Sequence, residues 1–154
     1  MLTIDASGAR VAIVASSWHA DIMGGLIGGA LRACEAAGAS SEVFPVAGSF
    51  ELPLVAKACA LSGSFDVVVA LGVVVRGGTP HFEYVCSATT DGVARVALET
   101  GMPVGFGLLT VDDEQQALDR AGLPGSREDK GREATEAALS SWTTLRGLAS
   151  AGRQ

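Results

Sequence analysis

Hydrophobic residues along this chain fall into short continuous runs and into longer segments with helical spacing. Four short runs predict strands, over 10–15, 42–46, 67–75 and 103–109. Five longer segments, whose apolar residues recur every three or four positions, predict helices over 20–38, 52–62, 80–101, 113–121 and 130–148. The run 67–75 shows no alternation, which is typical of a central strand with both faces covered.

Strands that alternate with helices predict a parallel sheet with helices on both faces. The expected fold class is therefore α/β: a three-layer, doubly wound, flavodoxin-like sandwich on a four-stranded parallel sheet of order 2-1-3-4. That order places the topological switch between the first and third strands, and ligands bind beyond the carboxyl ends of the strands there. The segments 16–19 and 76–81 leave those two ends and contain both histidines, His19 and His81.

Length, composition and charge narrow the class of protein. The 154 residues suit one domain over 1–154, with an N-terminal arm at 1–9 and a C-terminal tail at 149–154. Hydrophobic residues make up 48% and the formal charge is −6, which argues against nucleic acid or an anionic membrane as partner. The longest apolar run is too short to span a bilayer and no leader is evident, so we expect a cytoplasmic protein.

The cysteines and histidines predict neither disulfides nor a metal site. Cys34, Cys59 and Cys86 are odd in number and far apart, without the paired spacing of a zinc site. We expect three buried, inert thiols and no bound metal. The acidic run 112–114 is interpreted as a charged helix start rather than as a metal cluster.

The segment Gly77-Gly78-Thr79-Pro80 carries the most information about chemistry. Thr79 is a suitable N-cap and Pro80 a suitable first helical residue, while the two glycines let the backbone approach a ligand. Such a helix start favours an anion such as phosphate, although a tight turn without a ligand remains the alternative. His81 follows directly and could take and return a proton, or could serve only in packing.

Other candidate residues follow the first two strands. Trp18 and Phe50 would give a flat heterocycle a stacking surface, or would cover the core beneath a loop. Glu51 could accept hydrogen bonds from a polyol, or stabilise the first turn of its helix. The chain lacks the glycine-rich fingerprints of nucleotide-binding loops, and 47–51 does not fit the nucleophile elbow of serine hydrolases.

With these residues in view, the chain resembles the lumazine synthase family from about Val11 to Leu148. The segment 70–85 (ALGVVVRGGTPHFEYV) looks like the signature of the family, and 48–53 (GSFELP) is similar to a second motif. The third resemblance covers 103–110 (PVGFGLLT) with EQQA at 114–117 and DRAG at 119–122. Lys130-Gly131 with Glu133-Ala134 resembles the fourth motif.

The resemblance implies an enzyme of riboflavin biosynthesis that needs no cofactor. The family condenses 5-amino-6-(D-ribitylamino)uracil with 3,4-dihydroxy-2-butanone 4-phosphate through imine formation, phosphate elimination and ring closure, giving 6,7-dimethyl-8-ribityllumazine. By position, His81 would move protons, and Gly78, Thr79 and Arg120 would bind phosphate. The resemblance assigns pyrimidine and ribityl binding to Trp18, Ser49, Phe50, Glu51, Val73, Val74, Val75, Phe106 and Lys130.

The resemblance also implies assembly. Family members form rings of five with each active site shared between neighbours, so that Phe106 and Lys130 come from an adjacent subunit. The connection 122–129 looks like the longer kind found in members that stop at the pentamer, and a sixty-subunit shell is the alternative. Riboflavin synthase is the candidate protein partner.

Many members read Arg-Phe-Asn where this chain has Ser17-Trp18-His19. Trp18 preserves stacking, whereas His19 alters one contact. A paralogue that binds lumazine or riboflavin with little catalysis is therefore an alternative, and a generic doubly wound phosphosugar enzyme is a weaker one. The combination of His81, Arg120 and Lys130 favours the synthase.

Overall fold

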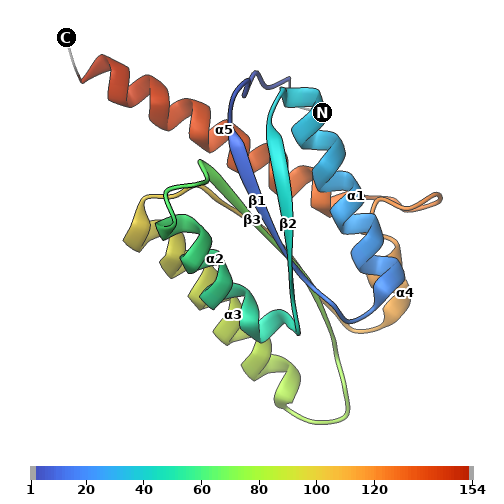
Figure 1. Cartoon of the computed structure of the whole chain (residues 1–154). Helices are drawn as coiled ribbons and strands as arrows, with labels where there is room; N and C mark the ends of the chain where they lie inside the picture. The colour runs from blue at the N-terminus through green and yellow to red at the C-terminus, as the bar shows by residue number, and fades with distance from the viewer. Residues whose placement is uncertain (1–2, 153–154) are drawn as a thin grey trace.

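A computed structural model describes residues 3–152 of the chain. Its sheet has four parallel strands in the order β2-β1-β3-β4, so the predicted fold class and strand order are confirmed (Figure 1). The strands are β1 (Arg10–Ser16), β2 (Ser40–Val46), β3 (Val67–Val75) and β4 (Val104–Val111).

Helices cover both faces of the sheet (Figure 1). One face carries α1 (Ala20–Ala37) and α5 (Lys130–Ala151), and the other carries α2 (Leu52–Leu61) and α3 (His81–Thr100). Two short elements complete the fold, the 3-10 turn η1 (Ser49–Glu51) and α4 (Glu114–Leu118). Because β1 and β3 are central, most of their valines and alanines are buried and form the middle of the core, whereas Val74 and Val75 at the end of β3 are partly exposed.

The predicted element bounds agree closely with the structure in the centre of the fold. The strand at 67–75 is confirmed, and Gly38 ends α1 in the left-handed conformation, with φ of 78°. The predicted helix over 113–121 is wrong in length, because α4 ends at Leu118. The chain then turns, and Ala121 forms an antiparallel bridge with Asp129.

The ends of the chain also differ from expectation. α5 continues to Ala151, three residues into the segment expected as a tail, and its last turns project beyond the body of the molecule (Figure 1). At the other end, Ala6 and Ala9 are fully buried, so the expected arm packs on the core over part of its length. Residues 1, 2, 153 and 154 of the expected arm and tail lie outside the described residues.

Glycines allow α1 to pack very closely on the segment that leads into α5. A side chain at Gly25 would overlap the carbonyl oxygen of Ala121, and one at Gly131 would overlap the backbone of Leu26. A side chain at Gly29 would overlap Asp129. This contact fixes where α5 begins, and therefore where Lys130 lies.

Candidate active site

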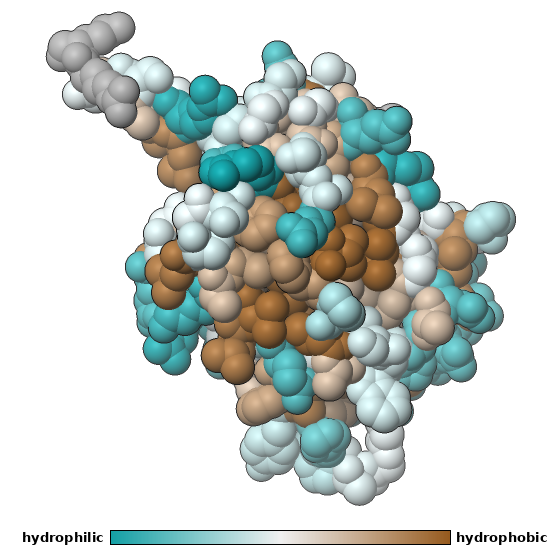
Figure 2. Space-filling model, viewed as in Figure 1, coloured by the Kyte–Doolittle hydropathy of each residue, from teal (hydrophilic) through white to brown (hydrophobic). Residues whose placement is uncertain are grey.

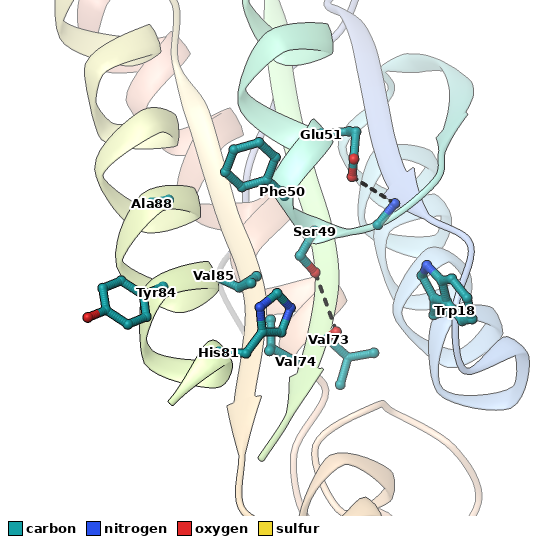
Figure 3. Close-up of a pocket in the computed structure, with 11 residues that line it drawn as sticks. Trp18, Ser49, Phe50, Glu51, Val73, Val74, His81, Tyr84, Val85 and Ala88 are labelled. Carbon is teal, nitrogen blue, oxygen red and sulfur yellow. Dashed lines mark hydrogen bonds between the residues drawn. The ribbon is translucent and has the colours of Figure 1, made fainter. Parts of the chain in front are cut away.

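A cavity of about 700 Å³ lies at the carboxyl end of the sheet, next to the switch between β1 and β3. Its walls come from the segments that follow β1 and β2, from the end of β3 and from the first turns of α3 (Figure 3). The lining residues are Trp18, Gly48, Ser49, Phe50, Glu51, Val73, Val74, His81, Tyr84, Val85 and Ala88. The location agrees with the expectation for an open parallel sheet.

Hydrogen bonds hold η1 between the sheet and α3. The Ser49 hydroxyl donates to the Val73 carbonyl at 3.4 Å (Figure 3), and the Thr89 hydroxyl donates to the Ser49 carbonyl at 3.2 Å. A side chain at Gly72 would lie 2.8 Å from the Ser49 hydroxyl, so the glycine leaves room for η1 on β3. The backbone around Phe50 is thereby fixed, while its ring stays exposed at the cavity.

Gly48, which precedes η1 and lines the cavity, lies close to both a carboxylate and an indole. Glu51 accepts a hydrogen bond from the Gly48 amide at 3.1 Å, which agrees with the alternative interpretation that it stabilises the first turn; its contact with a polyol stays a prediction. A side chain at Gly48 would lie 3.4 Å from Nε1 of Trp18. Trp18 therefore lies close to this backbone, on the opposite side of η1 from His81 (Figure 3).

His19 is the only non-glycine residue with positive φ among residues 3–152, at 57°. It occupies the N-cap position of α1, where its side chain makes no capping hydrogen bond. This left-handed conformation is uncommon for residues other than glycine, and histidine adopts it more often than most, as do asparagine and aspartate. It turns the chain sharply between Trp18 and α1, and leaves the Trp18 ring 69% exposed at the cavity.

The loop between β3 and α3 places His81 at the cavity, but the predicted helix start is wrong by one residue. Pro80, not Thr79, has the N-cap position, and no side chain caps it. The Pro80 carbonyl accepts a hydrogen bond from the Glu83 amide at 3.0 Å, which forms the turn before the helix. His81 is therefore the first helical residue rather than the second.

A second, smaller cavity of about 200 Å³ lies along β4 and contains three further predicted residues, Phe106, Arg120 and Lys130. β4 is an edge strand, so one side of its backbone is unpaired within the chain. Phe106 is 46% exposed there. The pairing of 121 with 129 brings Arg120 and Lys130 together although they are ten residues apart.

Both cationic side chains of this second cavity form ion pairs with carboxylates. Glu128 lies between them, 3.5 Å from Nε of Arg120 and 3.2 Å from Nζ of Lys130. Glu133 lies 3.1 Å from the same Nζ. Hydrogen bonds to Glu133 and Glu128 raise the pKa of Lys130 above its usual value.

The structure thus divides the predicted site residues into three groups. Seven line the first cavity: Trp18, Ser49, Phe50, Glu51, Val73, Val74 and His81. Three line the second, and Val75, Gly78 and Thr79 line neither. The sequence reading missed Gly48, Tyr84, Val85 and Ala88; the last three share a helical face with His81, a signal that spacing could have supplied.

The thiols fit the sequence prediction only in part. Cys34 and Cys59 are buried, and burial raises the pKa of Cys34 to about 11, as expected for an inert thiol. Cys86 is only half-buried, so the prediction of a buried thiol is wrong there. Asp113 of the acidic run caps α4 by accepting a hydrogen bond from the Gln116 amide at 2.9 Å.

Between residues 3 and 152, no group of three or more His, Cys, Asp or Glu side chains is arranged to hold a metal ion. Over the same residues, no helix has the length and apolar character needed to cross a membrane.

Comparison with known proteins decides the family. The family model described as 6,7-dimethyl-8-ribityllumazine synthase matches residues 8–146. The chain belongs to the 6,7-dimethyl-8-ribityllumazine synthase family. A protein of that name from Leifsonia xyli subsp. xyli is 64% identical over 145 residues, which are 94% of this chain and 91% of the relative.

Two more relatives with the same name support the assignment. The protein of Kocuria rhizophila is 62% identical over 93% of this chain and 91% of its own length. The protein of Kineococcus radiotolerans is 59% identical over 96% of this chain and 92% of its own length. These relatives of the lumazine synthase family favour neither a binding paralogue nor a generic phosphosugar enzyme.

Proposed function

We propose that this chain is a 6,7-dimethyl-8-ribityllumazine synthase, a transferase that condenses 5-amino-6-(D-ribitylamino)uracil with 3,4-dihydroxy-2-butanone 4-phosphate. The observation that carries the proposal is the cavity at the β1–β3 switch, which combines aromatic surfaces, a carboxylate and His81. Imine formation, phosphate elimination and ring closure need a stacking surface, an anion site and a proton carrier, without a cofactor.

In the first cavity, the pyrimidine stacks on Trp18, and Val73 and Val74 border its edge, with Val75 next along β3. Ser49, Phe50 and Glu51 hold the ribityl chain. His81 carries protons between the intermediates, an effect of roughly 10²–10⁴ in rate.

The phosphate binds between two parts of the molecule, the loop ahead of α3 and the second cavity. Gly78 and Thr79 offer backbone amides ahead of α3. Arg120 offers a charge-assisted contact from the second cavity, where Phe106 and Lys130 complete the pocket. We propose that Phe106, Arg120 and Lys130 reach the first cavity of a neighbouring subunit, because the two cavities have no lining residue in common.

This arrangement supports a homopentamer with shared active sites, and a sixty-subunit shell is the alternative assembly. Exposed apolar side chains on α2 and α3 support an interface between copies: Leu54, Leu61, Tyr84 and Leu98. Figure 2 shows apolar surface in the middle of one face of the molecule. A closed ring also suits a heterologous contact between two different surfaces of the chain.

We further propose that the enzyme is one domain, acts in the cytoplasm, and hands its product to riboflavin synthase. The three free cysteines support a reducing compartment. The mass of the assembly separates the alternatives: a pentamer weighs about five times the 15.6 kDa chain, whereas a shell approaches a megadalton.

One assay tests the activity. The two substrates are mixed with the protein, and lumazine fluorescence and released phosphate are followed together. We expect both products to form at equal rates, well above the spontaneous reaction. Tight binding of lumazine or riboflavin without turnover would instead support the binding paralogue.

A further inference from the structure

Arg76 is the last residue before the loop that carries Gly78, Thr79 and His81, and its side chain contacts three different groups. Nε donates to Asp112 at 2.9 Å, and Nη1 donates to Glu83 at 3.0 Å. The guanidinium carbon also lies 4.5 Å from the centre of the Phe82 ring. One side chain therefore joins the end of β3, the turn after β4 and the first turn of α3.

The loop itself has little other support. Among the described residues 3–152, no hydrogen bond reaches the backbone or the side chains of Gly77, Gly78 or Thr79. A side chain built at either glycine would meet nothing within 4 Å. The segment from Arg76 to His81 is exposed throughout. The position of this loop is consequently set by the groups at its two ends.

Those two ends are fixed by the contacts of Arg76. The Arg76 amide donates to the Val111 carbonyl at 2.8 Å, which anchors the first end to β4. At the second end, Phe82 is 9% exposed and packs under the guanidinium, next to His81 in sequence. Glu83 adds an ion pair one residue further along α3.

We propose that Arg76 is a positioning residue that holds the loop from Gly77 to His81 in the geometry needed for phosphate binding and proton transfer. Two of its donor groups are already taken by carboxylates and one face by an aromatic ring. It therefore acts through the loop and not as a phosphate ligand. The inference rests on the proposed function for its kinetic consequence, but the clamp itself can be tested without turnover.

The first test measures amide hydrogen exchange in the peptide from 76 to 84. In Arg76→Gln, we expect the hydrogen-bonded amides of this peptide, those of residue 76 and Glu83, to exchange faster while the sheet is unchanged, because the two ends of the loop are no longer tied. Arg10→Gln is the matched control. Arg10 is 51% exposed and pairs with Asp66 at 3.1 Å where β1 begins, remote in the fold from this loop. Unchanged exchange in Arg76→Gln would overturn the proposal.

The second test measures kinetics of the intact assembly. Because small misplacements of reacting groups are costly, Arg76→Gln should lower kcat about tenfold to a hundredfold. The KM for butanone phosphate should rise, whereas the KM for the pyrimidine should stay within about twofold, since its stacking residues lie outside the loop. Arg76→Lys should recover only part of the rate, because an ammonium cannot pair with two carboxylates and stack.

A double-mutant cycle with His81→Ala separates positioning from a general loss of structure. If Arg76 acts through His81, Arg76→Gln should cost clearly less kcat in the His81→Ala background than in the wild type. Equal losses in both backgrounds, or wild-type kinetics for Arg76→Gln, would contradict the positioning role. Absence of turnover by the wild type would refute the proposed function, and the exchange experiment would still decide whether Arg76 holds the loop.

Discussion

Mixing two inactive variants tests whether active sites are shared between neighbouring chains. His81 lines the first cavity of the chain, whereas Arg120 lines the second. His81→Ala alone should lose proton transfer, and Arg120→Ala alone should lose phosphate binding. In a ring where each site takes His81 from one chain and Arg120 from the next, a mixed assembly regains complete sites.

The size of the recovery follows from counting. In a random mixture of equal amounts, each site has a one-half chance of an intact His81 and a one-half chance of an intact Arg120, so about one quarter of the sites are complete. We therefore expect about a quarter of wild-type turnover, measured by lumazine fluorescence after the variants are unfolded and refolded together.

The control places both substitutions in one chain and mixes it with an equal amount of wild type. Shared sites again give about one quarter of the activity, whereas sites within one chain give about one half. Native mass spectrometry verifies that mixed assemblies form. If they form and the first mixture stays as inactive as its components, the shared-site model is refuted.

Three further predictions concern binding and stability. Trp18→Ala should raise the KM for the pyrimidine by roughly tenfold with a smaller effect on kcat, and Trp18→Phe should restore most of the binding; unchanged pyrimidine affinity would assign stacking to another residue. Gly131→Ala should lower the free energy of unfolding, measured in urea, by about 3 kcal/mol or more, because its methyl group would overlap the backbone of α1. Gly147→Ala in the same helix is the control. Its methyl group meets nothing within 4 Å, so it should be neutral or stabilising. A hydrogen bond from Arg10 lowers the pKa of Asp66 in the folded protein. The ionised Asp66 therefore stabilises the fold above the unfolded-state pKa of about 3.9, and this stabilisation is lost as the pH falls through the lower folded-state pKa. Asp66→Asn should reduce the fall in Tm over that acid range.

Sequence patterns predicted the centre of the fold better than its edges. Val67–Val75 was found at its bounds because a strand buried on both faces is a continuous apolar run. The turn after α4 was missed because its shape depends on contacts distant in sequence. The Ser126 hydroxyl bonds to the Leu118 carbonyl, and Gly122 adopts a φ of 70°, so the helical pattern stops early.

The candidate site shows the same limit. Motif resemblance named residues from both cavities, but spacing could not say that β4 is an edge strand whose Phe106 lines the second cavity and not the first. The role of Arg76 was also missed. Its partner Asp112 is distant in sequence and comes into reach only through the pairing of β3 with β4.

The glycine contacts between α1 and the start of α5 have a mechanical consequence for such an assembly. Trp18 lies two residues before α1, next to the N-cap His19, and Lys130 begins α5, where glycines let the two backbones approach closely. Neither helix can slide along the other without a backbone collision. In a ring of shared sites, the packed pair of α1 and α5 would therefore extend from the stacking residue of one site to the lysine of the next. Residues of two neighbouring sites would then belong to one closely packed unit of a single chain.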